Sequence, residues 1–211
     1  MPTVTASPTI VSTTPNSGTL TITNPSNVVS ANGVFASVSS VAPDHEFTPV
    51  ISHAILATGF DFSTVPDSAT LTGITYEGKV QASELEIVYS VIYMIENGVL
   101  THGFTVQPNW TETLAYESST LVTSLPSVAV LKASNFGLAM QIGFFGGDGV
   151  TSIDALVDHI RCTATYSEAV VSLSPTLFAS LPSNKGHLSI PLNKSHLTMP
   201  ENKGHLTIPN Q

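Results

Sequence analysis

The stretch ELEIVYSVIYMIENGVLTHGFTV, which runs from Glu84 to Val106, contains two apolar runs separated by Asn97-Gly98. Side chains of a β-strand point alternately to the two faces of a sheet. Asn-Gly between two such runs is the strongest short-range signal for a hairpin, because both residues tolerate the positive φ of a tight turn. The stretch therefore predicts two antiparallel strands joined by a two-residue turn.

Both faces of the first run are apolar, whereas a strand with one face in water alternates between apolar and polar residues. The second face therefore needs cover, either from another layer of this chain or from another subunit. We expect a homotrimer or a homodimer on this basis. One face carries Leu85, Ile87, Tyr89, Val91, Tyr93 and Ile95, and the candidate oligomer interface on the other face consists of Val88, Ile92 and Met94.

The rest of the body repeats this pattern of short apolar runs between turn residues, and no long window has helical periodicity. Charged residues make up only 10% of the chain, and hydrophobic residues make up 42%. We expect an all-β fold, a single antiparallel β-sandwich of the jelly-roll type, over residues 18–173. The predicted strands are Thr19–Thr23, Val34–Ser39, Ser52–Thr58, Thr70–Lys79, Leu85–Ile95, Leu100–Val106, Thr120–Thr123, Phe136–Phe145 and Leu156–Tyr166.

Two further segments flank this domain. Residues 1–17 are rich in Thr, Ser and Pro and predict an extended N-terminal arm. Residues 174–211 form a tail in which a motif of the type Asn-Lys-Gly-His-Leu-Thr-Ile-Pro recurs with a period of nine residues. Each unit predicts a four-residue strand that stops at Pro, because Pro has no N–H to donate to a continuing ladder.

The tail repeats allow three interpretations. The first is a ring of His residues that binds a metal around an oligomer axis, although one His per nine residues is a wide spacing for a metal site. The second is a small meander or stack of short strands. The third is a multivalent motif that adds strands to a sheet edge of a neighbouring subunit. The candidate partner-binding residues are Lys185, His187, Leu188, Ile190, Lys194, His196, Leu197, Met199, Lys203, His205, Leu206 and Ile208.

The charge is unevenly distributed along the chain. The formal net charge is −9. Residues 1–173 hold three basic and fourteen acidic groups, hence −11, whereas the tail holds three Lys and one Glu, hence +2. An acidic body argues against nucleic acid as a partner, because such binding depends on Lys and Arg at the phosphates. No apolar stretch has the length of a membrane span, so we also expect no membrane partner.

Several segments together resemble a β-sandwich domain that recurs in virion proteins of tailed bacteriophages. The first block has the order Leu-x-Ala-x-x-Phe-x-Phe, a Pro turn and an Ala-x-Ile-x-Gly-Ile type of strand, and the later blocks are Ala-Ser-Asn-Phe-Gly and Val-Asp-His-Ile-Arg. The matching positions are Leu56, Gly59, Phe60, Phe62, Pro66, Ala69, Gly73 and Ile74, then Ala133 to Gly137, then Val157 to Arg161. The resemblance spans roughly residues 14–168. Its middle strands carry less charge here than is usual in the family.

This resemblance implies a structural protein of the virion, with the major capsid protein or other virion subunits as partners. The small size, the two arms and the basic tail favour a capsid decoration, or cement, protein. A tail-fibre or baseplate protein that binds a host receptor is the alternative, and it should place Trp110 and Tyr116 in an exposed groove. The sequence shows no catalytic constellation, and we expect neither an enzyme nor a cofactor. Asp158 and His159 are expected on opposite faces of a strand, with His159 beside Val157 and Arg161.

Overall fold

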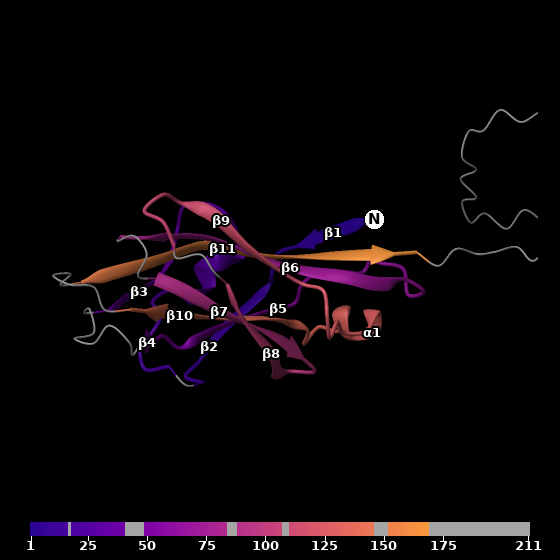
Figure 1. Ribbon diagram of the computed structural model, residues 1–211, viewed down its shortest axis with the longest axis horizontal. Coiled ribbons are helices and arrows are strands. Elements are labelled where there is room, and N and C mark those ends of the chain that lie inside the picture. Colours follow the sequence, from indigo (N-terminus) through magenta and orange to yellow (C-terminus); the bar gives the residue numbers. More distant parts are fainter. Residues whose placement is uncertain (17, 41–48, 84–87, 107–109, 146–151, 169–211) are drawn as a thin grey trace, which may run out of the picture. The chain divides into compact units, whose positions relative to one another are not determined.

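Antiparallel pairing connects every strand of the computed structural model, which describes residues 1–16, 18–40, 49–83, 88–106, 110–145 and 152–168. Two sheets face each other in a β-sandwich (Figure 1). The expected fold class is therefore confirmed. All tail repeats and residues 84–87 lie outside the described residues.

The five-stranded sheet has the order β1-β11-β6-β9, and β3 pairs with β11 beyond the end of β1. The six-stranded sheet has the order β2-β5-β10-β7-β8, and β4 pairs with β10. The strands of the first sheet are β1 (Thr3–Ala6), β3 (Ala36–Ser40), β6 (Thr70–Ala82), β9 (Ala115–Leu121) and β11 (Ile153–Ser167). Those of the second are β2 (Ile10–Thr14), β4 (Val50–Ile51), β5 (Ala54–Thr58), β7 (Val88–Glu96), β8 (Val99–Val106) and β10 (Gly137–Phe144).

The predicted hairpin is present. Asn97 and Gly98 have φ values of 53° and 79°, and they join β7 to β8. Two consecutive positive φ values match the right-handed twist of the flanking strands, which explains the preference for Asn-Gly at this turn. The turn thus sets the first two pairs of this hairpin, Glu96 with Val99 and Ile95 with Leu100, before the register shifts between Tyr93 and Ile95.

The core lies between the two sheets. Tyr76 of β6 is buried and donates its hydroxyl to Sδ of Met140 in β10 at 2.8 Å, so a polar contact joins the sheets inside an apolar layer. Aromatic rings fill one part of this layer, where Phe62 packs edge-on against Phe136 with 6.1 Å between ring centroids. Burial of such rings is a large stabilising contribution, about 1.5–3 kcal/mol for each fully buried large side chain.

The cover for β7 comes from this chain. Val88, Ile92 and Met94 are at most 1% exposed and belong to the core between the sheets. The prediction that these three residues form an oligomer interface is therefore wrong. The pattern correctly showed that the face needs cover, but the five-stranded sheet of the same chain supplies it.

The N-terminal segment is also different from the prediction. The segment from Thr3 to Thr14 does not form an arm outside the sandwich, because β1 pairs with β11 in one sheet and β2 pairs with β5 in the other. The chain crosses from sheet to sheet within three residues, Ser7 to Thr9. This segment therefore ties the two layers together along one edge.

The described residues also include two short helices, and one predicted strand is largely absent from them. The 3₁₀ helix η1 (Pro25–Val29) and the helix α1 (Val128–Leu131) were not predicted. Ser127 caps α1, and its Oγ accepts a hydrogen bond from the N–H of Val130. The predicted strand Thr19–Thr23 is reduced to isolated bridges at Leu20 and Thr23.

Candidate interaction surface

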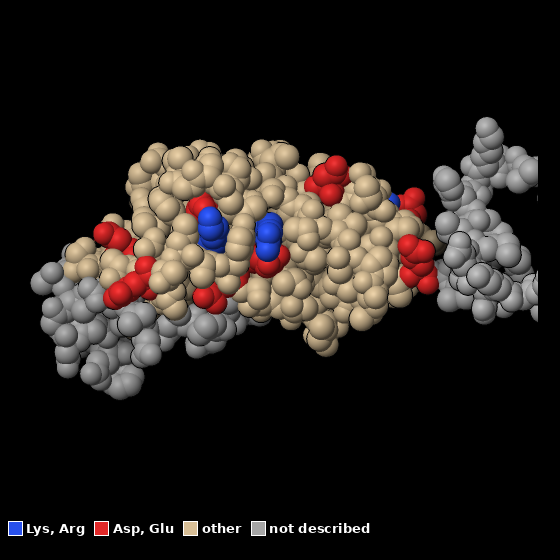
Figure 2. All heavy atoms as spheres, turned by 90° about the horizontal axis from the view of Figure 1, so that it is seen from above, with Lys and Arg blue, Asp and Glu red and all other residues tan. Residues whose placement is uncertain are grey.

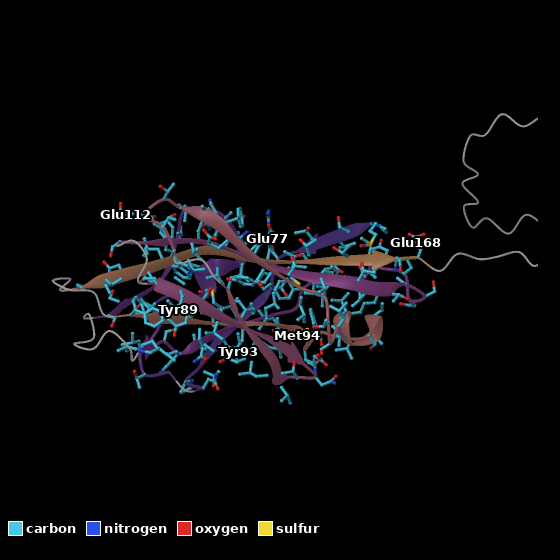
Figure 3. The ribbon with its side chains drawn as sticks, in the orientation of Figure 1. Glu77, Tyr89, Tyr93, Met94, Glu112 and Glu168 are labelled. Atoms are coloured by element: carbon cyan, nitrogen blue, oxygen red, sulfur yellow. The ribbon has the colours of Figure 1, made fainter. Side chains whose placement is uncertain are left out.

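The outer face of the six-stranded sheet carries an apolar cluster that is separate from the core. The strand register aligns Leu56, Ala139 and Tyr93 in a row across β5, β10 and β7. Figure 3 labels Tyr93 together with Met94, its neighbour in β7. Neighbours in a strand point to opposite faces, so Met94 enters the core while Tyr93 lies on the outer side. The cluster consists of Ala54, Ile95 and Ala139, with the half-buried Leu56, Tyr93 and Leu100 packed against it.

Small residues on the central strand shape this face. Gly137, Ala139, Gln141 and Gly143 of β10 occupy alternate positions on this outer face. At Gly137 a Cβ would lie 2.1 Å from the carbonyl oxygen of Ala57, so the close approach of β5 requires glycine. At Gly143 a Cβ would collide with the Tyr89 ring, which lies across this position.

A groove opens at the end of this face where the β7–β8 turn lies. Its volume is about 320 Å³. Aliphatic side chains from four strands, Ile10, Leu56, Ile95 and Leu100, provide the apolar lining. The polar groups of Ser12, Thr58, Ser134 and Asn135, together with Gly98, complete it. A mostly apolar lining with a few polar groups is the usual composition of a binding groove.

The groove lies beside an edge strand. β2 pairs with β5 on one side, and no strand among the described residues pairs with its other side. Ile10, in this strand, is 58% exposed. An edge strand with unpaired N–H and C=O groups and an exposed aliphatic side chain is a template for a further strand.

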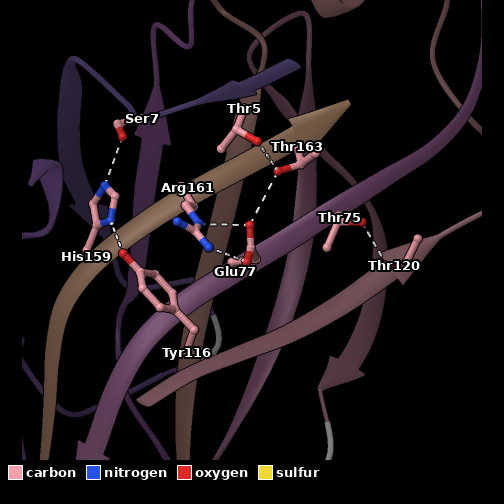
Figure 4. A network of polar contacts seen from close by, with 9 residues as sticks. All are labelled: Thr5, Ser7, Thr75, Glu77, Tyr116, Thr120, His159, Arg161 and Thr163. Carbon is pink, nitrogen blue, oxygen red and sulfur yellow. Dashed lines mark hydrogen bonds and ion pairs between the residues drawn. The ribbon is translucent and has the colours of Figure 1, made fainter. Parts of the chain in front are cut away.

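The outer face of the five-stranded sheet is polar. Arg161 of β11 donates two hydrogen bonds to the Glu77 carboxylate of β6, at 2.8 and 2.6 Å (Figure 4). Hydroxyl groups extend this network to β1. Thr163 Oγ1 lies 2.7 Å from Thr5 Oγ1 in β1, and the Thr163 hydroxyl donates to Glu77 at 3.3 Å. Cross-strand pairs of this kind stabilise neighbouring strands. The network therefore fastens the N-terminal strand β1 to the sheet.

His159 occupies the centre of this face. Its Nε2 lies 2.9 Å from Ser7 Oγ, and its Nδ1 lies 2.9 Å from the hydroxyl of Tyr116 in β9 (Figure 4). Burial lowers the pKa of the imidazole, and the charges of Arg161 and Lys79 lower it further, while the carboxylates of Asp158 and Glu77 act in the opposite direction. Nδ1 thus contacts β9, and Nε2 contacts Ser7 in the link between β1 and β2, so the imidazole connects β11 to two other segments.

Asp158 lies at a β-bulge between Val157 and His159. Its carboxylate accepts hydrogen bonds from Lys79 Nζ and from the backbone N–H groups of Asn32 and Gly33. Burial alone would raise the pKa of this carboxyl, but the hydrogen bond from Lys79 and the two backbone donors outweigh it, so the pKa is lowered.

The bulge also corrects an expectation about His159. The extra residue at a bulge shifts the alternation of the strand. Val157 consequently faces the core, with 0% exposure, while His159 lies on the outer face with Arg161. The predicted sharing of a face therefore holds for Arg161 and is wrong for Val157.

Charged side chains are sparse on this polar face. Figure 2 views the molecule from the side of the five-stranded sheet and shows Lys and Arg atoms near the middle, with separate groups of Asp and Glu around them. Ion pairs of the described residues join Lys79 to Asp158, Lys132 to Asp67 and Arg161 to Glu77. Most of the visible surface is uncharged, so this face offers no broad basic patch to a polyanion.

Within the described residues, no group of three or more His, Cys, Asp or Glu side chains is arranged to hold a metal ion. Across the same residues, none of the helices has the length and hydrophobicity that crossing a bilayer requires. The predicted tail residues, Lys185 to Ile208, lie outside the described chain, so their part in binding stays a prediction.

The sequence indicated none of the groove residues as a site. Ile10 belongs to the segment that the sequence predicts as an N-terminal arm, and Leu56 belongs to the segments that resemble the phage virion domain. Their proximity depends on the pairing of β2 with β5 and of β5 with β10, which joins residues far apart in the chain. The one local signal was the apolar outer face of β7, where Tyr93 and Ile95 alternate with core residues.

Comparison with known proteins gives no family. No family model matches the chain, and no curated protein matches it. Among solved structures, one described as "CBM4 structure and function" is 12% identical, with a TM-score of 0.35, over 77% of this chain and 94% of that chain.

Two further structures are similar at the same level. A family 30 carbohydrate-binding module of a cellulosomal cellulase from Clostridium thermocellum is 8% identical, with a TM-score of 0.33, over 74% of this chain and 88% of that chain. A structure of the Gx strain of infectious bursal disease virus is 12% identical, with a TM-score of 0.26, over 81% of this chain and 36% of that chain. Identities and TM-scores this low assign no function.

Proposed function

We propose that this chain is a structural protein of a tailed-phage virion, and specifically a capsid decoration protein that attaches to neighbouring subunits. The observation that carries the proposal is the outer face of the six-stranded sheet, where an apolar groove lies beside an edge strand. Apolar surface of this kind on a soluble domain marks a site of protein contact. The major capsid protein or another virion subunit is the partner that the sequence resemblance implies.

The resembling segments lie at positions that shape the sandwich. The first block runs from β5 into β6 and contributes the buried Phe60 and Phe62. The second, Ala133 to Gly137, leads from α1 into β10, and the third, Val157 to Arg161, contains the bulge of β11. These are turns, core positions and a bulge, so the resemblance concerns the architecture of the sandwich.

The alternative, a receptor-binding fibre or baseplate protein, depended on exposed aromatic residues. Trp110 is 1% exposed and therefore belongs to the core. Tyr116 contacts His159, and the Arg161 guanidinium lies 4.0 Å from the centroid of its ring. These two residues do not share an exposed groove, and this arrangement favours the decoration role over receptor binding.

The test adds the purified chain to tailed-phage particles and measures how much of it binds. Every strand pair of the described residues lies between Thr3 and Ser167, and residues 1–170 form one compact unit, so a chain without residues 183–211 retains the sandwich. We expect the full chain to bind the particle surface and to raise the temperature at which the particle releases its DNA. The shortened chain should bind with lower occupancy.

Two outcomes would contradict this proposal. If the full chain is absent from capsids and antibody labelling places it on tail fibres, the decoration role is wrong. If the shortened chain reaches the same occupancy as the full chain, the tail is not an anchor.

A further inference from the structure

The groove on the six-stranded sheet lies beside β2, because Ile10 and Ser12 belong to β2 and also line the groove. The helix η1 packs against part of β2, but no strand among the described residues pairs with its outer edge. We propose that this combined site receives one His-Leu-Ser/Thr-Ile/Met repeat from the tail of a second copy of this chain, added as a strand to β2. The inference deepens the proposed function, on which it rests for the role of the tail as an anchor.

The dimensions of the two segments agree. β2 has five residues, Ile10–Thr14, and each repeat has a run of four residues between its Asn-Lys-Gly/Ser turn and its Pro. A strand of this length can pair along β2 and then stop, because Pro has no N–H to donate to the next rung of the ladder. Strand addition to a sheet edge derives affinity from main-chain hydrogen bonds and specificity from alternate side chains.

The side-chain pattern of the repeat also agrees with this edge. In the last repeat Leu206 and Ile208 share one face of the run, while His205 and Thr207 share the other. Neighbouring strands place side chains of one face about 5 Å apart. Leu and Ile on the outer side would therefore cover the exposed Ile10 and extend the apolar lining of the groove.

The opposite face of the added strand meets a suitable surface as well. Thr13 of β2 points away from the groove and is exposed, whereas Val11 on the same face packs against the core. A His or Thr side chain opposite the Thr13 hydroxyl would stay in contact with water, which suits polar groups at a sheet edge. With its aliphatic residues towards the groove, the repeat thus places its polar residues near this exposed end of β2.

Charge and chain length favour a second copy as the source of the repeat. The tail carries a net charge of +2 and residues 1–173 carry −11, so tails are attracted to other copies of the body. β11 ends at Ser167 and the first complete repeat begins at Asn184. The sixteen residues between them span up to about 55 Å when extended, which is enough to reach a neighbouring molecule.

The number of repeats is a further reason to propose a contact between the tail of one copy and the groove of another. Each chain has three complete repeats, which end at Pro191, Pro200 and Pro209, and any of them could occupy the groove beside β2. Several equivalent strands raise the effective concentration of the motif at a groove without a new type of contact. A tail-to-groove contact joins different surfaces of two copies, so it can close a ring of subunits.

The test measures self-association of the full chain by sedimentation velocity over a range of concentrations, in buffer without particles. We expect association that weakens at least tenfold in Ile10→Lys, because the charge blocks the groove. Val122→Lys, with the same change at an equally exposed aliphatic site outside the groove, should associate like the wild type. The combined variant Leu188→Ser, Leu197→Ser and Leu206→Ser should weaken association as much as Ile10→Lys.

A second measurement locates the contact. A synthetic peptide with the sequence of residues 202–209 should protect the backbone amides of β2 from hydrogen exchange, whereas the same peptide with Ser at the Leu206 and Ile208 positions should not. Three results would overturn the inference: a wild type that stays monomeric, association that survives the triple Leu variant, or peptide protection on another edge. Particle binding is measured separately, so either proposal can fail without the other.

Discussion

Lys79 in β6 donates a hydrogen bond of 2.8 Å to Asp158 at the bulge of β11, and the Asp158 side chain has no exposed surface. The same carboxylate accepts the N–H groups of Asn32 and Gly33 at 3.1 and 2.8 Å. One buried acidic group therefore joins the two long strands of the five-stranded sheet to the segment that follows η1. A buried carboxylate is tolerated only when it is paired and hydrogen-bonded, as it is here.

Asp158→Ala should lower the free energy of unfolding by about 3 kcal/mol, because it removes a buried ion pair and leaves two backbone donors without their acceptor. Urea denaturation measures this change. Asp154→Ala is the matched control on the same strand, since the exposed Asp154 accepts one hydrogen bond from Ser39. We expect a loss of at most about 1 kcal/mol there. Equal losses in the two variants would show that burial of Asp158 is not important.

The stability contributed by His159 should depend on pH. The folded protein lowers the pKa of this imidazole below its ordinary value of 6.5, so below that pH the unfolded chain binds more protons than the folded one. The contribution is therefore complete above pH 6.5 and decreases as the pH falls towards the lowered pKa. We expect the difference in unfolding free energy between the wild type and His159→Gln to shrink over this range.

Urea denaturation at several pH values on both sides of 6.5 tests this prediction. The other six histidines are present in both proteins, so their titration cancels in the difference. A difference that grows as the pH falls would mean that the folded state prefers the charged imidazole. That result would contradict the neutral, doubly hydrogen-bonded ring between Ser7 and Tyr116.

Local signals in the sequence predicted most of the fold. Asn97-Gly98 fixed the β7–β8 hairpin, and the long alternation of β6 is visible in its residues. The two N-terminal strands were missed because Thr and Ser dominate them and Pro interrupts the segment, which resembles an extended arm. The bulge at Asp158 was missed because one extra residue leaves no compositional trace.

The candidate surface could not be predicted in the same way. Apolar residues on both faces of β7 indicated that something covers the strand, but a local pattern does not distinguish a second sheet from a second subunit. The structure buries Ile92 beneath the other sheet and leaves Tyr93 on the outer face. The groove itself depends on the register of Ile10 with Thr58 and of Thr58 with Gly137, which are long-range pairings.

Cys162 should be unreactive until the protein unfolds. It is the single cysteine of the chain, it is 0% exposed, and burial raises the pKa of its thiol. The thiolate is the reactive form, so both access and ionisation oppose modification. A thiol reagent should label the native protein at the slow rate of unfolding and label the urea-unfolded protein at once. Rapid labelling of the native protein would mean that the core layer under β11 is open to solvent.

Two glycines of the six-stranded sheet should respond differently to alanine. Gly98 has a φ of 79° and open space around its Cα, so Gly98→Ala meets only backbone strain of about 1–2 kcal/mol. Gly137→Ala would place a Cβ 2.1 Å from the carbonyl oxygen of Ala57, an overlap with backbone that rotation of a side chain cannot relieve. We expect a loss above 2 kcal/mol in urea denaturation, together with separation of β5 from β10.

Because Gly137 lies between Thr58 and Ile95 in the register, Gly137→Ala should also stop the tail peptide from binding at the groove, whereas Gly98→Ala should still bind it. Equal stability of the two variants would contradict the close approach of β5 to β10.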